Sequence, residues 1–349
     1  MRLLVTGHTG YIGSVLSGVL LEKGYSVTGF DIDYYDGCEL FPTPYSVPQI
    51  KKDIRDVSAE DLKDVDAIIH LAGLSNDPLG ELSPGLTDDI NLKATIRLAE
   101  LAKRRGVKRF IYASSQSMYG ISKVDVELDE DDSEKNPLTA YARTKWEAEQ
   151  ALKKMASKDF LVVCFRPSTV FGASPKLRVD IVYNNLLACA FTTGRIEIKS
   201  DGTAWRPVVH VRDVSQAFIA GLEAPAELVA GQSFNVGIPD GNFSVRQLAE
   251  AAQRSVPGST LVFTGEHGSD TRTYRVSFKK ILTILKDHYQ PQWDLDKGGR
   301  ELVELFKKVG FREDWFRGRR CNRLAQIKSL LDTNRLDREL RMIHGSVGR

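Results

Sequence analysis

The sequence contains a tyrosine and a lysine that are spaced to act together in proton transfer. Tyr141 and Lys145 are four residues apart in a stretch that is predicted to be helical, so both side chains project from one helix face. An ordinary tyrosine ionises at about pH 10, which is too high for a base at neutral pH. The ammonium of Lys145, together with a positively charged nicotinamide ring, would favour the phenolate and lower its pKa. Lys145 can also reach the ribose that carries such a ring.

A serine before this helix could share the substrate oxygen with the tyrosine. Ser115 follows the short apolar stretch Phe110–Ala113, which is predicted to be a strand. Its hydroxyl is predicted to hydrogen-bond the oxygen whose proton Tyr141 takes. The neighbouring Ser114 leaves open which serine has this role, because serines at strand ends often serve as caps.

A glycine-rich loop at the N-terminus predicts a phosphate site. Gly7, Gly10 and Gly13 follow the apolar stretch Leu3–Val5 and open a helix predicted near Tyr11–Lys23. The first glycine permits a tight turn, the second lets a pyrophosphate approach the backbone, and the third lets the helix pack against the sheet. The amides and dipole at the start of the helix then face the phosphates. The loop, serine, tyrosine and lysine together predict hydride transfer between a nicotinamide and a carbinol.

A carboxylate at the end of the second predicted strand indicates which dinucleotide is used. Asp31 lies 18 residues after Gly13, close to the spacing of an acid that binds the adenosine ribose hydroxyls. A carboxylate there repels a 2′-phosphate, so NAD(H) is favoured over NADP(H). The alternatives are a solvated aspartate at a strand end and a role shared with Asp33.

The elements that must position these residues alternate between strand and helix. The predicted strands of the first 170 residues are Leu3–Val5, Val27–Asp31, Ala67–Leu71, Phe110–Ala113 and Leu161–Arg166. Helices are predicted near Tyr11–Lys23, Asp88–Arg105 and Leu138–Ala156. This alternation predicts an α/β protein with a Rossmann-type, doubly wound parallel sheet.

The pattern loosens after Gly172, where we expect a smaller, mostly helical substrate-binding domain. Helices are predicted at Asn184–Thr192 and Asp213–Leu222, and strands at Arg195–Lys199, Val208–Val211 and Ser233–Gly237. Residues 1–167 plus about 208–238 are assigned to the NAD-binding domain. Residues 168–207 plus about 239–349 are assigned to the substrate-binding domain, so the two interleave along the chain.

The composition excludes several classes of partner. Among 349 residues the net charge is +2, too balanced to indicate nucleic acid or a membrane surface. No apolar stretch is long enough to span a membrane, and the first predicted strand begins too early for a signal peptide. The cysteines are scattered without metal-ligand spacing. We therefore expect a cytoplasmic enzyme without a metal site.

The motifs in order resemble the extended short-chain dehydrogenase/reductase superfamily, in its NAD-dependent nucleotide-sugar epimerase/dehydratase family. The resemblance runs from residue 2 to about residue 285. It rests on the GxxGxxG loop, Asp31, Asp53-Ile54, His70-Leu71-Ala72-Gly73, Asn91, Ser-Ser-x-Ser-x-Tyr-Gly at 114–120, YxxxK and Arg206-Pro-Val-Val-His-Val. It implies a homodimer and a nucleotide-sugar substrate.

The resemblance also implies roles for individual residues. Tyr11 and Ile12 would lie under the pyrophosphate, and Asp53 and Ile54 would hold the adenine. The remaining cofactor residues would be Leu71, Ala72, Gly73, Asn91 as a buttress, and Pro167 near the nicotinamide.

On the substrate side, Arg206 and Arg272 would bind the diphosphate. Asn185 matches a substrate asparagine, and Ser75 and Arg178 are weaker candidates. Thr169 stands where galactose-acting members carry asparagine, and Glu266 stands where many members carry arginine, so the sugar stays open.

The reaction is narrowed by residues that are missing. Dehydratases of the family carry an acid two or three positions before the tyrosine of the Tyr-Gly pair, where this chain has Gln116 and Ser117. The absence of this acid disfavours dehydration, and the NAD preference implied by Asp31 favours epimerisation with NAD recycled over net oxidation or reduction. The resemblance implies that the epimerised carbon is C4. A dehydrogenase or ketoreductase, a dehydratase and a non-catalytic NAD-binding regulator are the alternatives. The arginine-rich extension Phe311–Met342 lies outside the resemblance and is expected to be a solvated helical face, although it could cover the site or serve assembly.

Overall fold

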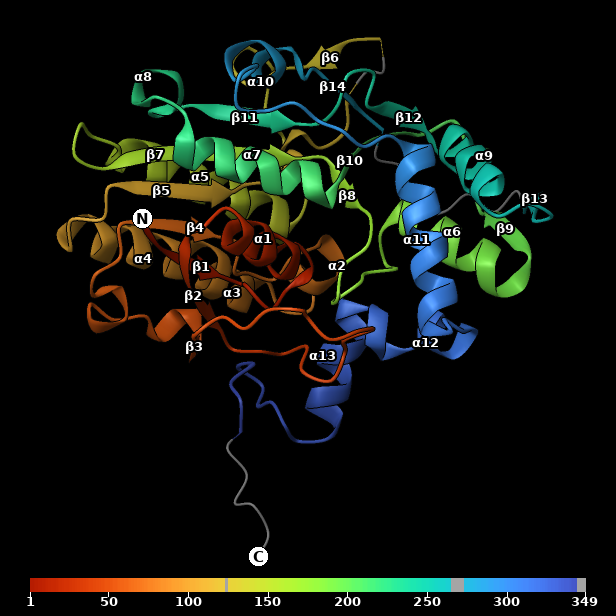
Figure 1. The fold of residues 1–349 in the computed structure, drawn as a ribbon, viewed down its shortest axis with the longest axis horizontal. Coiled ribbons are helices and arrows are strands. Elements are labelled where there is room, and N and C mark those ends of the chain that lie inside the picture. Colours follow the sequence, from red (N-terminus) through yellow and green to blue (C-terminus); the bar gives the residue numbers. More distant parts are fainter. Residues whose placement is uncertain (123–124, 265–272, 344–349) are drawn as a thin grey trace, which may run out of the picture.

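A parallel sheet forms the centre of the molecule (Figure 1). The computed structural model describes residues 1–122, 125–264 and 273–343. Within these ranges, seven parallel strands form this sheet in the order β11-β7-β5-β4-β1-β2-β3. Their bounds are β1 Arg2–Thr6, β2 Ser26–Asp31, β3 Gln49–Lys51, β4 Ala67–His70, β5 Arg109–Ala113, β7 Leu161–Pro167 and β11 Ser233–Val236. The predicted Rossmann-type sheet is confirmed, with β3 as an edge strand that the sequence pattern did not predict.

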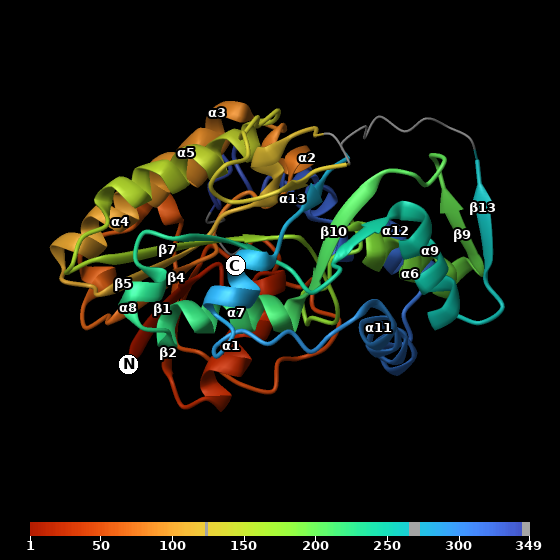
Figure 2. The same cartoon turned by 90° about the horizontal axis from the view of Figure 1, so that it is seen from above.

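Helices cover both faces of this sheet (Figure 2). One face carries α1 (Tyr11–Glu22) and α7 (Val211–Glu223), and the other carries α4 (Ala94–Arg104) and α5 (Ala140–Met155). The strands alternate between the two cores, since Leu3 and Val5 pack in one cluster and Leu4 in the other. Short helices complete the region: α2 Asp77–Gly80, α3 Pro84–Thr87, a π-helical stretch Asp88–Lys93 and α8 Ala226–Val229.

The second part of the molecule consists of small sheets and helices beside the carboxyl ends of the strands (Figures 1 and 2). Its strands are β8 Thr169–Phe171, β10 Trp205–His210, β12 Asn242–Ser244, β9 Arg195–Ile198, β13 Thr260–Phe263, β6 Glu127–Leu128 and β14 Arg275–Val276. Its helices are α6 Val182–Thr193, α9 Val245–Ser255, α11 Leu295–Val309 and α12 Glu313–Arg317. Helix α10 (Lys279–Ile284) lies instead against β11, the edge strand of the large sheet (Figure 1). The last helix of the chain is α13, Arg323–Asp332.

Two segments lie elsewhere than their assigned domain. β10 pairs with β8 and β12, so the chain returns to the large sheet with α7 at Val211 and not at Val208. α13 does not follow the substrate region, because Ile327 and Leu330 pack in the same core cluster as Phe30 of β2. Neither difference is visible in local hydrophobic patterns, which do not say which sheet a segment joins.

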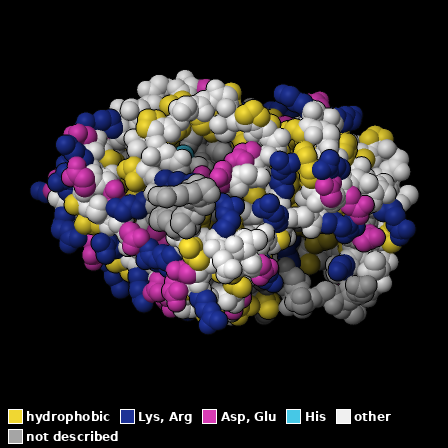
Figure 3. Space-filling model, turned by 90° about the horizontal axis from the view of Figure 1, so that it is seen from below, with side chains coloured by type: hydrophobic (Ala, Val, Ile, Leu, Met, Phe, Trp, Pro, Cys, Tyr) yellow, Lys and Arg dark blue, Asp and Glu magenta, His cyan; other side chains and the backbone are white. Residues whose placement is uncertain are grey.

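The surface carries charges of both signs. On the face shown in Figure 3, lysine and arginine side chains are interspersed with aspartate and glutamate over the whole view. This distribution agrees with the small net charge of +2. Among the described residues, no helix is both long and apolar enough to cross a membrane. These residues also contain no cluster of three or more side chains suited to hold a metal ion.

Candidate active site

A cavity of about 590 Å³ lies where the carboxyl ends of the parallel strands meet the second part of the molecule. This is the position at which open α/β sheets bind ligands. Most of the predicted site residues line it: Gly7, Gly10, Tyr11, Ile12, Gly13, Asp31, Asp53, Ile54, Leu71, Ala72, Gly73, Ser75, Ser115, Tyr141, Lys145, Pro167, Thr169, Arg178 and Arg206.

The N-terminal loop has the close packing that a phosphate cradle needs. Gly7 has φ of +72°, and a Cβ there would lie 2.8 Å from the backbone nitrogen of Ala72. A Cβ at Gly13 would lie 2.2 Å from the carbonyl oxygen of Gly7, so the turn and helix could not pack as they do. Gly10 is the N-cap of α1 and offers no side chain to its first amides. These donors therefore suit an anion such as a dinucleotide pyrophosphate.

Asp31 is fixed at the end of β2 by backbone amides. Its carboxylate accepts hydrogen bonds from the Thr9 nitrogen at 3.1 Å and from the Asp33 nitrogen at 2.9 Å. Asp33 itself has φ of +67° and pairs with Lys51 at 3.8 Å, and it is not among the cavity-lining residues. The geometry therefore favours Asp31 over Asp33 as the carboxylate for a ribose.

Asp53 and Asn91 are both held by hydrogen bonds to nearby backbone groups. The Asp53 carboxylate accepts from the backbone nitrogen of Arg55 at 2.8 Å and pairs with its guanidinium at 2.5 Å. Asn91 does not line the cavity, but its amide exchanges hydrogen bonds of 2.8 and 3.0 Å with Leu74. A Cβ at Gly73 would lie 2.9 Å from the Asn91 oxygen. Asn91 thus supports the loop after β4 from behind.

Tyr141 and Lys145 reach the cavity from the first turns of α5. The Thr139 side chain caps this helix by accepting from the Ala142 nitrogen at 3.1 Å. The Lys145 ammonium donates to the carbonyl of Ala113 at 2.7 Å, which ties the helix to the end of β5. Ser115 follows that strand and lines the same cavity as Tyr141.

The proton affinities of this pair are set by burial. Burial raises the pKa of Tyr141 to about 12, against the opposing effect of the Ser115 hydrogen bond. Burial likewise lowers the pKa of Lys145 to about 8. In the protein alone the phenol therefore holds its proton at neutral pH, since burial outweighs the effects that favour the phenolate. Positive charge from a bound nicotinamide would have to supply the difference.

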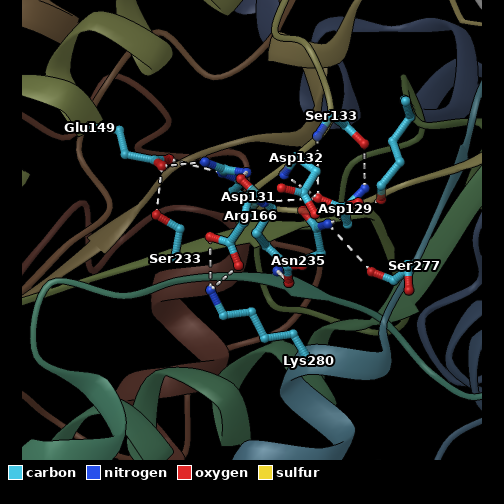
Figure 4. A network of polar contacts seen from close by, with 12 residues as sticks. Asp129, Asp131, Asp132, Ser133, Glu149, Arg166, Ser233, Asn235, Ser277 and Lys280 are labelled. Atoms are coloured by element: carbon cyan, nitrogen blue, oxygen red, sulfur yellow. Dashed lines mark hydrogen bonds and ion pairs between the residues drawn. The ribbon is translucent and has the colours of Figure 1, made fainter.

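A buried ion pair between α5 and β7 lies at the centre of a network of polar contacts (Figure 4). Glu149, one turn after Lys145 on α5, pairs with Arg166 of β7 at 2.5 Å, and both side chains are at most 1% exposed. Ser114 donates to Glu149 at 2.6 Å, and Ser233 donates to it at 2.7 Å. The Ser114 hydroxyl is therefore engaged in this buried network, whereas Ser115 lines the cavity.

The strength of this ion pair follows from its hydrogen bonds. Burial works against ionisation of Glu149, but the Arg166 charge and the serine hydrogen bonds outweigh it and hold the pKa of Glu149 below its usual range. Arg166 also donates to the Tyr119 hydroxyl at 2.8 Å. The network links α5, β5, β7 and β11, so it fixes the catalytic helix against the sheet.

The substrate side of the cavity carries a second ion pair. Arg178 pairs with Asp180 at 2.9 Å, and its Nη1 donates to the Ser75 hydroxyl at 3.4 Å. Asn76 donates to Asp180 at 3.0 Å. Ser75 and Arg178 are thus brought together as one polar wall of the cavity.

Two predicted substrate residues are not found in this wall. Asn185 is exposed and its amide donates to the Val179 carbonyl at 2.9 Å, so it does not line the cavity. Its neighbour Asn184 is buried, accepts from the Gly172 nitrogen at 3.1 Å and donates to the Tyr11 hydroxyl at 3.2 Å. In a helix, one position changes the face by 100°, and the sequence did not fix which asparagine points inward. Arg272 lies outside the described residues.

Sequence reasoning also missed several cavity residues. These are Tyr34, Tyr35, Asn76, Asp77, Asp180, Tyr274, Asn322, Arg323 and Leu324. Asp180 could have been found from its position two residues after Arg178. The residues of the C-terminal extension carried no signal beyond their positive charge.

Comparison with known proteins identifies the family. The family model described as NAD dependent epimerase/dehydratase family matches residues 3–237. The chain belongs to the NAD-dependent epimerase/dehydratase family. It is an NAD-dependent enzyme, as the resemblance implied.

Relatives within this family include two sugar-nucleotide epimerases. A UDP-glucose 4-epimerase of Corynebacterium glutamicum is 27% identical over 316 residues, covering 82% of this chain and 94% of that protein. A UDP-glucuronate 4-epimerase of Thermodesulfobacterium geofontis is 26% identical and covers 88% of this chain and 98% of its own. The structure of MoeE5 in complex with UDP-glucose and NAD matches with a TM-score of 0.74 and 26% identity, over 88% of this chain and 99% of that one.

Proposed function

We propose that the enzyme interconverts two UDP-sugars by epimerisation at C4. The observation that carries the proposal is that Ser115, Tyr141 and Lys145 line one cavity together with the hydrogen-bonded pair Ser75 and Arg178. The named relatives act as UDP-glucose and UDP-glucuronate 4-epimerases, which supports this substrate class.

The chain's own residues would handle the proton of the sugar hydroxyl. NAD, when bound, supplies a group that accepts a hydride and returns it. Tyr141 takes the proton of the C4 hydroxyl through its phenolic oxygen and returns it to the new hydroxyl. Ser115 orients the same oxygen by a hydrogen bond, and Lys145 holds α5 at the end of β5 through the Ala113 carbonyl.

The same wall disfavours elimination of water. Gln116 stands where dehydratases carry an acid, and its amide donates to the Arg166 carbonyl at 3.0 Å. The Ser117 hydroxyl lies 2.9 Å from that of Ser115. Two carboxylates do line this part of the cavity, but Asp77 accepts from Thr139 at 2.5 Å and Asp180 is paired with Arg178. An acid and a base for C5 and C6 are therefore absent from the Gln116–Ser117 position.

The substrate would be held by the opposite wall and the loops near it. We propose Arg206 and Arg272 for the diphosphate, and Ser75, Thr169 and Arg178 for the sugar. The cofactor would be held by the loop Gly7–Gly13, by Asp31 and by the carboxyl ends of β4 and β7. Asn185 is left out of this proposal because its side chain points away.

A direct test is product analysis with two substrates. UDP-glucose and UDP-glucuronate are incubated separately with the enzyme and followed by proton NMR, with Tyr141→Phe as the matched control. The proposal predicts that one of them reaches an equilibrium with its C4 epimer and that no water is lost. A 4-keto-6-deoxy product, or steady formation of NADH, would replace the proposal by the dehydratase or the dehydrogenase.

A further inference from the structure

The C-terminal extension supplies part of the cavity wall. Asn322, Arg323 and Leu324, at the start of α13, line the same cavity as Tyr11 and Ile12 of the phosphate loop. In Figure 1, α13 follows α12 at the lower part of the molecule, and its Ile327 and Leu330 pack in the same core cluster as Phe30 of β2. A segment outside the family match thus closes a site built mostly from the first half of the chain.

The extension is fastened to this place by contacts with the nucleotide-binding loops. The Tyr34 hydroxyl donates to the Leu340 carbonyl at 2.5 Å, and Arg55 donates to the Glu339 carbonyl at 2.7 Å. Arg341 forms ion pairs with Asp56 and, at 3.4 Å, with Asp53. The segment therefore packs as a fixed part of the cofactor end.

Arg323 is the buried cation of this segment. Its side chain is 2% exposed, and its guanidinium lies 4.0 Å from the ring centre of Tyr35. Nη2 donates to the Lys176 carbonyl at 2.7 Å. Within the described ranges, no carboxylate lies within 4.0 Å of this guanidinium, and no other hydrogen bond of it is found.

The charges around Arg323 do not balance. Arg178 lies nearby and lowers the pKa of Arg323 together with burial, which is the larger effect. The carboxylate of Asp180 is already engaged by Arg178, and Lys176 is paired with Glu39. A buried guanidinium without a paired anion costs several kcal/mol, and contact with one aromatic ring recovers only part of this. An anion delivered into the cavity would remove the imbalance.

The position of the Arg323 guanidinium indicates which anion would bind to it. Burial raises the pKa of Tyr35 to about 12, and Asp180 and Asp31 both contribute to the shift. Arg323 therefore packs on a ring that lies within electrostatic reach of the ribose carboxylate. Its charge also acts on Tyr11, at the start of the helix that faces phosphates. Tyr11 and Tyr35 both line the cavity together with the glycine loop and Asp31.

We propose that Arg323 is a cofactor-binding residue that holds the diphosphate of NAD from the side opposite the glycine loop. The C-terminal extension is then an integral part of the cofactor site, and not a solvated helical face. The inference rests on NAD as the cofactor and is independent of the proposed reaction on the sugar.

The test compares ligands that differ in the diphosphate. The affinities of NADH, ADP-ribose, adenosine and UDP are measured by titration calorimetry for the full-length wild type and for the variants Arg323→Met and Arg338→Met. The second variant is the control, because Arg338 is an exposed arginine of the same extension. Arg323→Met is expected to lower the affinity for NADH and for ADP-ribose about 10- to 100-fold, which is typical for the loss of a charged hydrogen bond. Adenosine, which lacks the diphosphate, and UDP should bind as to the wild type, and Arg338→Met should change nothing.

Stability separates a binding role from a structural one. Removal of an uncompensated buried charge should leave the melting temperature of the cofactor-free Arg323→Met protein unchanged or raise it. If Arg323→Met does not fold, the Arg323→Lys variant is measured in its place. The proposal then stands only if Arg323→Lys folds and selectively loses affinity for ADP-ribose; otherwise the role of Arg323 is structural. Unchanged ADP-ribose affinity, or weakening confined to UDP, would overturn the assignment.

Discussion

The two halves of the cavity are built in different ways. The sheet half is formed by residues at strand and helix ends, such as Gly7, Asp31 and Tyr141, which the backbone places directly. The opposite half is formed by loops, and it is held together by ion pairs such as Arg178–Asp180. The first arrangement fixes the chemistry on a rigid element, whereas the second can vary its charges without disturbing the sheet.

The two halves also differ in where their buried ion pairs lie relative to the cavity. Arg166–Glu149 lies beneath the sheet half with hydrogen bonds from Ser114 and Ser233, and it does not line the cavity. Arg178–Asp180 lines the cavity with about a tenth of each side chain exposed. An arginine–carboxylate pair is therefore fully enclosed in one half, whereas in the other half such a pair borders the cavity.

The largest effect should come from the phenol of the sheet half. Tyr141→Phe removes one oxygen and keeps the packing, so the protein should fold and bind NAD as the wild type does. Turnover should fall by about 10²–10⁴, the usual contribution of a positioned acid–base group. Steady-state kinetics with calorimetric NAD binding check both statements, and wild-type turnover would refute the role of Tyr141.

The two ion pairs should respond differently to loss of the carboxylate. Glu149→Gln leaves Arg166 buried without its anion and should cost about 3–5 kcal/mol of unfolding free energy. Asp180→Asn, the matched change in the other half, should cost less stability because its partner borders the cavity, and it should act mainly on KM. Denaturant unfolding and steady-state kinetics of both variants test this difference. Equal losses of unfolding free energy in Glu149→Gln and Asp180→Asn would contradict the prediction.

Cofactor choice should depend on one carboxylate. NAD should bind well and NADP poorly, since Asp31 repels a 2′-phosphate. Asp31→Ala should reduce the difference in binding free energy between NAD and NADP by about 1–3 kcal/mol, because it removes both the repulsion of the 2′-phosphate and a charged hydrogen bond to the ribose. Fluorescence titration with NADH and NADPH measures the two affinities. Equal affinity of the wild type for NADH and NADPH would contradict the role of Asp31.

The smallest predicted effect is a pH dependence of stability from Lys145. Burial lowers its pKa to about 8, so above that pH the folded protein holds fewer protons at this site than the unfolded chain does. Stability of the cofactor-free protein should therefore gain from this group as pH rises from about 8 toward the ordinary lysine range. Lys145→Met should remove this slope in thermal unfolding, and a slope equal to that of the wild type would show that the lysine is not destabilised by burial.

The sheet half could be predicted from the sequence because its signals are local. The glycine spacing, the aspartate after β2 and the Tyr-x-x-x-Lys pair each depend on residues close in the chain, and the family resemblance placed them in order. Asn184 was missed in favour of Asn185 because helix orientation depends on distant packing. Arg323 was missed because its neighbour Tyr35 is 288 residues away in the sequence.

The raised pKa of Tyr141 was also beyond sequence reasoning. The sequence showed the lysine that would lower it but not the burial that raises it to about 12. The homodimer expected from the resemblance stays a prediction, and light scattering on the purified protein would test it.

Transfer of a label within the substrate tests the proposed epimerisation most directly. A UDP-sugar deuterated at C4 is incubated with the enzyme without added cofactor, and the product is examined by mass spectrometry and NMR. The proposed reaction predicts a C4 epimer that retains the deuterium at C4, with no net change in NADH absorbance. Loss of the label to solvent, stoichiometric NADH, or exchange at C5 with loss of water would contradict it.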